Sequence, residues 1–263
     1  DLASLKTRAE RRGDVYVVNG QKTWTTLGHY ADRIFCLVRT STEGKPQEGI
    51  SFLLIDMKSP GITVRPIILL DGEHEVNEVF YDSGGVRAAP RAGEENKGWP
   101  TPKPAQTPEG TGPANIGNSA AALAQLKDIA GKVTKRGRPL SKDPYFAARM
   151  AQVEIDLEAL KITNLRMLVE ADAGAAAGPE SSMLKIKGTV IRQEINDLSR
   201  RALGPLALPF VSEALDEGYN EAPIGPDEAN AAASDYFNNR KLSIFAGSNE
   251  IQRGIISKTK LGL

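Results

Sequence analysis

The segment GSNEIQ near the end of the chain combines helix-capping residue types with a negative charge. Ser248 or Asn249 can accept a hydrogen bond from a free backbone N–H at the start of a helix, and Glu250 suits the positive end of the helix dipole. Free N–H groups at a helix start also bind anionic ligand groups well. The segment therefore predicts the start of the last helix, with a structural cap, a binding site or both.

Two arginines, Arg136 and Arg138, lie in the basic stretch TKRGRPL. A guanidinium group suits paired phosphate oxygens because its N–H donors form a planar fork, although a basic loop can also be plain solvated surface. His29 and His74 are isolated, and we expect them in a turn and in a surface loop, without the spacing of metal ligands. No GxGxxG follows a strand, which argues against a Rossmann-type nicotinamide enzyme.

The chain has 263 residues with 33 basic and 33 acidic side chains, so its formal net charge is zero. No overall field would draw it to nucleic acid or to an anionic membrane, and no apolar run approaches the roughly 20 residues of a transmembrane segment. The single cysteine, Cys36, lies in the apolar run RIFCLVRT, which favours a buried thiol in a reducing compartment. We expect a cytoplasmic protein, with the mitochondrial matrix as the alternative.

The first hundred residues are typical of β structure, because runs of Val, Ile, Phe, Tyr and Thr alternate with turn residues. The expected strands include RIFCLVRT, GISFLLIDM, ITVRPI and NEVFYDS. Asn19-Gly20 tolerates the positive φ angles of a type I′ turn, so residues 15–18 and 21–25 are expected to pair as a hairpin. We predict a small antiparallel β-barrel or sandwich domain over residues 1–98.

From residue 115 onward the apolar spacing becomes helical. One expected helix ends at Gly204-Pro205, which would stop it. Another carries an apolar stripe formed by Met150, Val153, Leu157, Leu160, Leu165 and Leu168. About four amphipathic helices bury such stripes most simply against one another, so residues 115–263 are predicted to form a four-helix-bundle domain. Residues 99–114 hold five prolines and predict a linker or a disrupted helix, in an α+β chain.

Six segments, in their order along the chain, resemble the middle and C-terminal domains of the acyl-CoA dehydrogenases. They are DLASLKT, VNGQKTWTT with ADRIFCLVRT, GISFLLIDMKSPGITVRPI, NEVFYD, GEENKGW and SIFAGSNEIQR. The resemblance implies an FAD-dependent oxidoreductase of fatty acid β-oxidation that oxidises the Cα–Cβ bond of an acyl-CoA thioester. It also implies an electron-transfer flavoprotein as partner, a homotetramer or dimer, and an N-terminal helical domain that is absent from this sequence.

The resemblance assigns Trp24, Thr25 and Thr26 to the flavin, with Thr26 near the flavin N5. An indole offers a flat face to an isoalloxazine ring, and the hydroxyls can hydrogen-bond its polar edge. The same residues are also ordinary strand formers, which is the alternative interpretation.

At the other end of the chain, the resemblance places Ser248, Asn249 and Glu250 beside the cofactor and Gly247 at the substrate. It further implies that Arg136 reaches the flavin pyrophosphate across a subunit interface, with a register uncertain by the two residues that separate it from Arg138.

In most members of the family, the base that removes the α proton is a glutamate at the position of Ala246, which cannot accept a proton. Some members place the glutamate after the β domain, and counting from GEENKGW that position falls on Glu109. We therefore predict Glu109 as the base and the backbone N–H of Ala246 as a donor to the thioester oxygen. Gly110 and the surrounding prolines depart from the family pattern, so a Glu109 without a catalytic role is the alternative.

Ala246 also leaves two other functions open. One is a non-catalytic homologue that binds flavin or acyl-CoA, or supports an active partner subunit. The other is an acyl-CoA oxidase on the same fold that hands electrons to oxygen. A small side chain at this position leaves more room beside the acyl chain than a glutamate would, which favours branched or bulky substrates.

Overall fold

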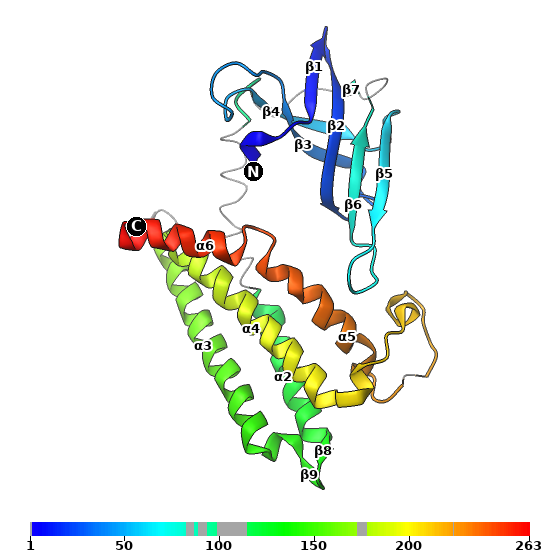
Figure 1. Ribbon diagram of the computed structural model, residues 1–263, viewed down its shortest axis with the longest axis vertical. Coiled ribbons are helices and arrows are strands. Elements are labelled where there is room, and N and C mark those ends of the chain that lie inside the picture. Colours follow the sequence, from blue (N-terminus) through cyan, green and yellow to red (C-terminus); the bar gives the residue numbers. More distant parts are fainter. Residues whose placement is uncertain (1, 83–86, 89–93, 99–114, 173–177, 223) are drawn as a thin grey trace. The chain divides into compact units, whose positions relative to one another are not determined.

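The computed structural model describes residues 2–82, 87–88, 94–98, 115–172, 178–222 and 224–263 (Figure 1). The chain divides into two compact units, Asp1–Gln106 and Thr107–Leu263. The predicted linker over residues 99–114, and Glu109 within it, lie outside the described residues. The domain boundaries at 98 and 115 therefore stay predictions.

The first unit is built on one β-sheet whose strands follow the order β4-β3-β1-β2-β6-β5, with β7 paired to β2. The elements are η1 (Leu2–Ser4), β1 (Arg8–Arg12), β2 (Val15–Thr26), β3 (Arg33–Arg39), β4 (Ile50–Asp56), β5 (Ile62–Ile67), β6 (Val76–Tyr81) and β7 (Arg87–Ala88). Neighbouring strands are antiparallel except for one parallel pair between β1 and β3. Within the described residues β4 and β5 end the main strand order and do not pair with each other, so the sheet is mostly antiparallel, as predicted, but does not close into a barrel.

The hairpin predicted at Asn19-Gly20 is wrong, because β2 runs straight through this position as one strand, Val15–Thr26. Gly20 has a φ of 138°, and a Cβ there would lie 2.8 Å from the Cα of Thr7. Glycine is therefore required here because two backbones approach each other closely, and not because the chain turns. The hairpin is formed instead by β1 and β2, which reverse at Gly13.

The buried face of the sheet forms an apolar core in which the inward residues of β2 alternate with outward ones. Cys36 is 1% exposed within this core, as predicted, and burial raises the pKa of its thiol. The buried members of the core are Ala9, Tyr16, Val18, Cys36, Val38, Leu53, Ile55, Met57, Val79 and Tyr81.

The second unit is helical, with a short β8–β9 ribbon (Figure 1). The α-helices are α2 (Ile116–Lys132), α3 (Pro144–Asp172), α4 (Glu180–Leu203), α5 (Glu228–Asn238) and α6 (Asn249–Ile256). The ribbon strands are β8 (Thr134–Lys135) and β9 (Arg138–Pro139), and the short helical turns are η4 (Leu140–Lys142), η5 (Gly204–Ala207), η6 (Ser212–Leu215), η7 (Asn239–Ser243) and η8 (Ser257–Leu261). None of the described helices is long and apolar enough to cross a membrane.

Helix α4 is the centre of this unit, because it packs against α2, α3, α5 and α6. Its buried Leu184, Ile191 and Ile195 join the main helical core. The helix ends at Leu203, and Gly204 then takes a φ of 58°, which confirms the predicted stop. Helix α5, rich in alanine, is an addition to the four helices that the sequence predicted.

The apolar stripe of α3 is buried along only part of its length. Val153, Leu157 and Leu160 are at most 4% exposed and pack in the core, whereas Leu165 and Leu168 are 56% and 47% exposed. The prediction that all of them share one buried face is therefore wrong for the last two. Helical periodicity identifies a face, but it does not say how far a neighbouring helix extends along it.

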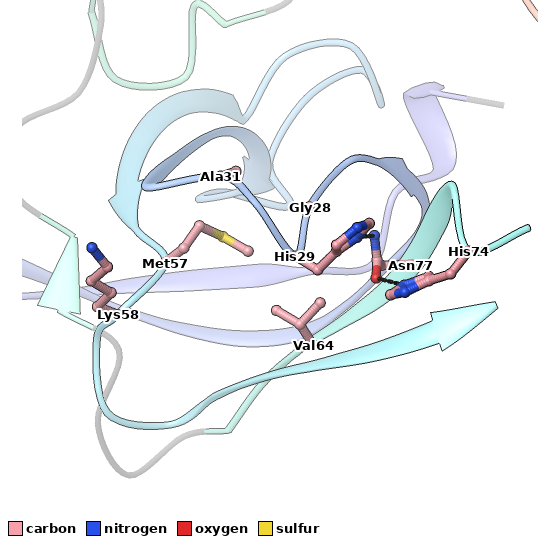
Figure 2. Close-up of a pocket in the computed structure, with 8 residues that line it drawn as sticks. All are labelled: Gly28, His29, Ala31, Met57, Lys58, Val64, His74 and Asn77. Carbon is pink, nitrogen blue, oxygen red and sulfur yellow. Dashed lines mark hydrogen bonds between the residues drawn. The ribbon is translucent and has the colours of Figure 1, made fainter. Parts of the chain in front are cut away.

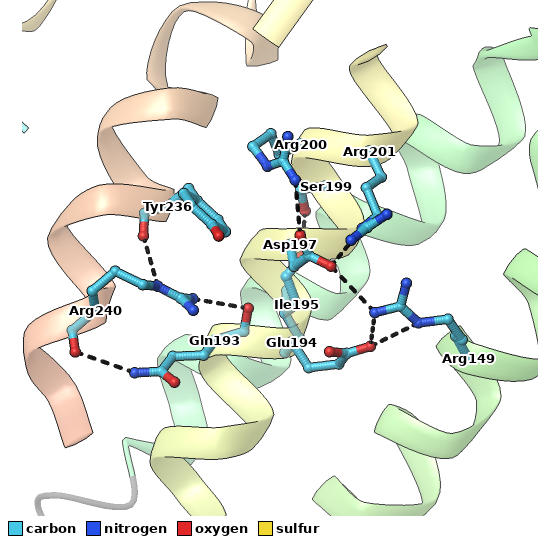
Figure 3. Close-up of polar contacts among 10 residues, drawn as sticks. All are labelled: Arg149, Gln193, Glu194, Ile195, Asp197, Ser199, Arg200, Arg201, Tyr236 and Arg240. Carbon is cyan, nitrogen blue, oxygen red and sulfur yellow. Dashed lines mark hydrogen bonds and ion pairs between the residues drawn. The ribbon is translucent and has the colours of Figure 1, made fainter. Parts of the chain in front are cut away.

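A cluster of ion pairs ties α3 to α4 at the half-buried Asp197 (Figure 3). Its carboxylate accepts hydrogen bonds from Arg149 of α3 at 3.2 Å, and from Arg200 at 3.0 Å and Arg201 at 2.6 Å on its own helix. Desolvation alone would raise the pKa of Asp197, but the hydrogen bonds from the three arginines outweigh it, so the pKa lies below its ordinary value.

We expect acid to destabilise the helical unit partly through Asp197. A carboxyl group whose pKa is lower in the folded protein stabilises the fold above its unfolded pKa of about 3.9, and this contribution is lost as the pH falls through the folded value. Asp197→Asn should lower the free energy of unfolding near neutral pH by about 1–3 kcal/mol and should flatten its decline in acid. Urea unfolding, followed by helical circular dichroism at a series of pH values, measures both effects.

The matched control is Asp156→Asn, because Asp156 pairs with the exposed Lys187, at 3.2 Å, and with no arginine among the described residues. Its expected cost is below about 1 kcal/mol. A pH dependence that is the same in the natural protein and in the Asp197 variant would contradict the prediction.

Candidate functional site

The end of β2 carries a strained turn. The pairing of β2 with β6 shifts register between Lys22 and Thr25, which leaves a bulge in the strand. Trp24 within the bulge has a φ of 64°, and Leu27 just after the strand has a φ of 52°. Bulky side chains seldom adopt this left-handed conformation, which costs on the order of 1–2 kcal/mol per residue.

This turn brings together three of the residues predicted to bind a ligand. Trp24 is 65% exposed, so its indole face is available. The hydroxyl groups of Thr25 and Thr26 make no hydrogen bond within the part of the chain that the structure describes. An exposed aromatic face and two unpaired hydroxyls on a strained turn are suited to a planar ligand with a polar edge.

The two histidines of the sequence meet beneath this turn (Figure 2). The rings of His29 and His74 stack with centroids 3.9 Å apart, and both hydrogen-bond the fully buried carboxamide of Asn77. His29 lies in a turn as predicted, and His74 lies in the loop between β5 and β6 as predicted, but its side chain is half-buried there. The residues around the adjoining pocket of about 250 Å³ are Gly28, His29, Ala31, Met57, Lys58, Val64, His74 and Asn77.

Trp24→Gly is expected to separate the stability of the β unit from ligand binding. Glycine adopts a φ of 64° without strain, so the free energy of unfolding should stay the same or rise by up to about 1 kcal/mol. Loss of the indole face should weaken the binding of a planar aromatic cofactor by at least about tenfold. Urea unfolding and cofactor titration on the same variant measure the two quantities, and unchanged cofactor affinity would contradict the proposed role of Trp24.

A second strained turn precedes α6. Ala246 and Gly247 have φ values of 52° and 78°, and their backbone N–H groups make no hydrogen bond within the described residues. Ser248 then caps the helix, since its Oγ accepts from the N–H of Ile251 at 3.4 Å. Successive left-handed residues with free N–H groups form a concave donor site for an anionic oxygen.

Two neighbouring residues at this helix start have different surroundings. The Glu250 side chain is 77% exposed, and its own backbone N–H and the Ser248 hydroxyl lower the pKa of its carboxyl group. Asn249 is 7% exposed and faces α4, where its Oδ1 accepts from the ammonium of Lys185 at 2.9 Å and from Thr189 at 3.4 Å. The Asn249 side chain therefore joins α6 to α4. Burial of Lys185 lowers the pKa of its ammonium group.

Arg136 lies in the tight turn of the β8–β9 ribbon, with a φ of 53°, and its side chain is exposed. The ribbon and the start of α6 are at opposite ends of the long helices of this unit (Figure 1). Within one chain, the ribbon that carries Arg136 is thus remote from the start of α6. Arg138 follows in β9 and is also exposed.

Sequence reasoning did not find the contacts of Asn77, His29, His74 and Lys185. Asn77 lies opposite Thr25 in the β2–β6 ladder, 52 residues away in sequence, and a strand register would have been needed to see this. A lysine at a core position of the α4 pattern was the available signal for Lys185. No cluster of three or more potential metal-binding side chains occurs among the described residues.

Two domain profiles of one family match the chain. The acyl-CoA dehydrogenase middle domain matches residues 1–82, and the acyl-CoA dehydrogenase C-terminal domain matches residues 107–261. The acyl-CoA dehydrogenase IpdE1 of Mycobacterium tuberculosis is 29% identical over 263 residues, which are 100% of this chain and 63% of that protein. The cyclohexane-1-carbonyl-CoA dehydrogenase of Geobacter metallireducens is 27% identical over 268 residues, which are 98% of this chain and 64% of that protein.

Solved structures show the same fold. In the crystal structure of the ChsE4–ChsE5 complex from Mycobacterium tuberculosis, one chain superposes with a TM-score of 0.80 at 28% identity, over 100% of this chain and 65% of that chain. The present chain thus spans a little less than two thirds of the length of these relatives. With both profiles matched in order and the fold shared, the chain belongs to the acyl-CoA dehydrogenase family, of which it carries the middle and C-terminal domains.

Proposed function

We propose that this protein is an FAD-dependent dehydrogenase that removes two hydrogens from the Cα–Cβ bond of an acyl-CoA thioester. The strained turn at Trp24–Thr26 is the observation that carries the proposal. Its exposed indole and two hydroxyls, which make no hydrogen bond within the described residues, fit an isoalloxazine ring with polar edge atoms, and the strain indicates a functional constraint on the turn. A bound FAD would supply the hydride acceptor for this reaction.

The residues of the chain have separate tasks in this proposal. Glu109 takes the α proton as general base. The backbone N–H of Ala246, unpaired in the described chain, donates to the thioester oxygen and stabilises the negative charge that develops there, with Gly247 beside it. Ser248 and Glu250 lie at the start of the same helix and face a polar ligand group, while Asn249 fixes that helix to α4.

The partners are also part of the proposal. An electron-transfer flavoprotein receives the electrons, and the protein acts as an oligomer in which Arg136 binds flavin phosphate in a neighbouring subunit. The exposed position of Arg136, at the far end of the helices from α6, supports a role outside its own chain's site. A guanidinium fork suits the paired oxygens of a pyrophosphate.

We propose bulky or alicyclic acyl groups as the substrate class. The methyl group of Ala246 leaves more room than a glutamate side chain at the same position. A relative named for cyclohexane-1-carbonyl-CoA supports the same choice. Comparable turnover of short straight-chain and alicyclic thioesters would contradict it.

Anaerobic mixing of the FAD-loaded protein with a panel of acyl-CoA thioesters tests the function. The expected result is bleaching of the visible flavin absorbance by at least one alicyclic or branched thioester, and slower bleaching by short straight-chain thioesters. Steady peroxide formation in air without a protein electron acceptor would indicate an oxidase instead.

A second candidate is a non-catalytic subunit that supports an active partner. Ala246, which cannot act as a base, is the observation that favours it. The similar chain from Mycobacterium tuberculosis was solved as part of the ChsE4–ChsE5 complex, which is the kind of assembly that such a role requires. Binding of a thioester without bleaching, by a protein that holds FAD, would put this candidate first.

A further inference from the structure

The carboxamide of Asn77 has a fixed orientation. Its Nδ2 lies 3.0 Å from the carbonyl oxygen of Thr25, directly across the β2–β6 ladder. A carbonyl oxygen can only accept, so the nitrogen of the carboxamide must face Thr25 and the oxygen must face the other way. A single backbone carbonyl therefore determines every other hydrogen bond of this buried group.

The orientation of the carboxamide also fixes the role of one ring nitrogen in each histidine. The second hydrogen of Asn77 Nδ2 is directed to Nδ1 of His29, 3.1 Å away, so this nitrogen must be unprotonated and His29 must carry its hydrogen on Nε2. The Oδ1 of Asn77 lies 2.6 Å from Nε2 of His74, which must carry a hydrogen to donate. Both hydrogens and the oxygen of the carboxamide are then used, as a fully buried amide requires (Figure 2).

This network is attached to the strained turn between its two left-handed residues. Thr25 lies between Trp24 and Leu27, whose φ values are 64° and 52°. The carbonyl of Thr25 also accepts from the N–H of Gly28, and a Cβ at Gly28 would lie only 3.1 Å from Cγ2 of Thr25. The hydrogen bonds to the Thr25 carbonyl keep it on the buried side of the sheet. They therefore oppose a change of the turn away from its left-handed conformation.

We propose that His29, His74 and Asn77 are positioning residues for the flavin-binding turn. They act through the Thr25 carbonyl and keep the Thr25 and Thr26 hydroxyls where a flavin can use them. The inference rests on the proposed flavin-binding function of this turn, but it does not depend on catalysis. Mutations in the network should therefore change FAD affinity even with no thioester present.

The geometry predicts that asparagine and glutamine have opposite effects at the two histidine positions. Asparagine should preserve the network at position 29 and disrupt it at position 74, and glutamine should do the reverse. The amide of asparagine occupies the place of a histidine Nδ1, and the amide of glutamine occupies the place of Nε2. His29→Asn keeps an acceptor for Asn77, whereas His29→Gln does not. His74→Gln keeps a donor to Asn77, whereas His74→Asn does not.

The FAD dissociation constant of each variant, measured by flavin fluorescence, gives the first test. His29→Asn and His74→Gln should stay within about threefold of the natural protein, and His29→Gln and His74→Asn should weaken binding by roughly tenfold or more. Four equal effects, or none, in a protein that binds FAD would overturn the positioning role alone. Failure of the natural protein to bind FAD would overturn it together with the proposed cofactor.

Nitrogen-15 NMR of the imidazole groups gives a second test that does not need FAD. The sequence holds two histidines, so the spectrum contains two ring systems, and comparison with either conservative variant assigns them. His29 should carry a hydrogen on Nε2 and none on Nδ1, and His74 should carry a hydrogen on Nε2. A hydrogen on Nδ1 of His29 would overturn the network.

Discussion

Glu109→Gln is expected to slow the bleaching of bound flavin by acyl-CoA about 10²–10⁴-fold, while thioester binding persists. The amide is close in size and shape to the carboxylate but cannot take the α proton. Anaerobic stopped-flow absorbance measures the rate, and displacement of a fluorescent acyl-CoA analogue measures binding. Bleaching at the natural rate would show that the base is another residue.

Two further variants make this test specific. Glu94→Gln is the matched control, because Glu94 is an exposed carboxylate paired with Lys97 and is expected to leave the rate unchanged. Adding Ala246→Glu to Glu109→Gln should recover part of the lost activity, since a carboxylate then stands where most of the family carries it. Ala246 already holds a φ of 52°, so glutamate adds no new backbone strain there.

Asn249→Ala is expected to destabilise the helical unit by about 2–3 kcal/mol. The ammonium of Lys185 is almost fully buried and donates to Oδ1 of Asn249 at 2.9 Å. Removing the acceptor leaves a buried cation without its hydrogen-bond partner, which costs more than the loss of an ordinary neutral hydrogen bond. Urea unfolding followed by helical circular dichroism measures the change.

The double variant Asn249→Ala/Lys185→Met separates this cause from a loss of packing. Methionine keeps much of the lysine stem but has no charge, so the double variant should recover at least about 1 kcal/mol relative to Asn249→Ala. Lys187→Met, at an exposed position two residues further along α4, is the control and should cost less than about 1 kcal/mol, because it removes only the ion pair with Asp156. A double variant less stable than Asn249→Ala would contradict the role of the buried charge.

The elements that the sequence predicted correctly depend on local signals. Ser248, one of the two residues expected to do so, caps α6, and Gly204 ends α4, because a cap or a left-handed glycine acts on the turn in which it stands. The change from strands to helices follows from periodicity alone. These features needed no knowledge of what packs nearby.

The features that the sequence did not predict depend on distant neighbours. Gly20 looked like a turn residue, but it is required by the approach of Thr7. Leu165 looked like a core residue, but it lies on a part of α3 that no described helix covers deeply. Asn77 and the two histidines form a network only after β2 and β6 have paired in one register. Periodicity and residue type do not contain that information.

The two halves of strand β2 pair with strands that lie at very different distances from it along the chain. Its first half pairs with β1 across the tight turn at Gly13, whereas the contact between Thr25 and Asn77 closes a loop of 52 residues. Long loops close at a greater entropic cost, and non-local strand pairs form later during folding. In pulse-labelling hydrogen exchange during refolding, we therefore expect amides near Val17 to gain protection before those near Thr26. The turn that would hold the flavin is then the last part of its own strand to fold, and a cofactor added during refolding would accelerate only that late step.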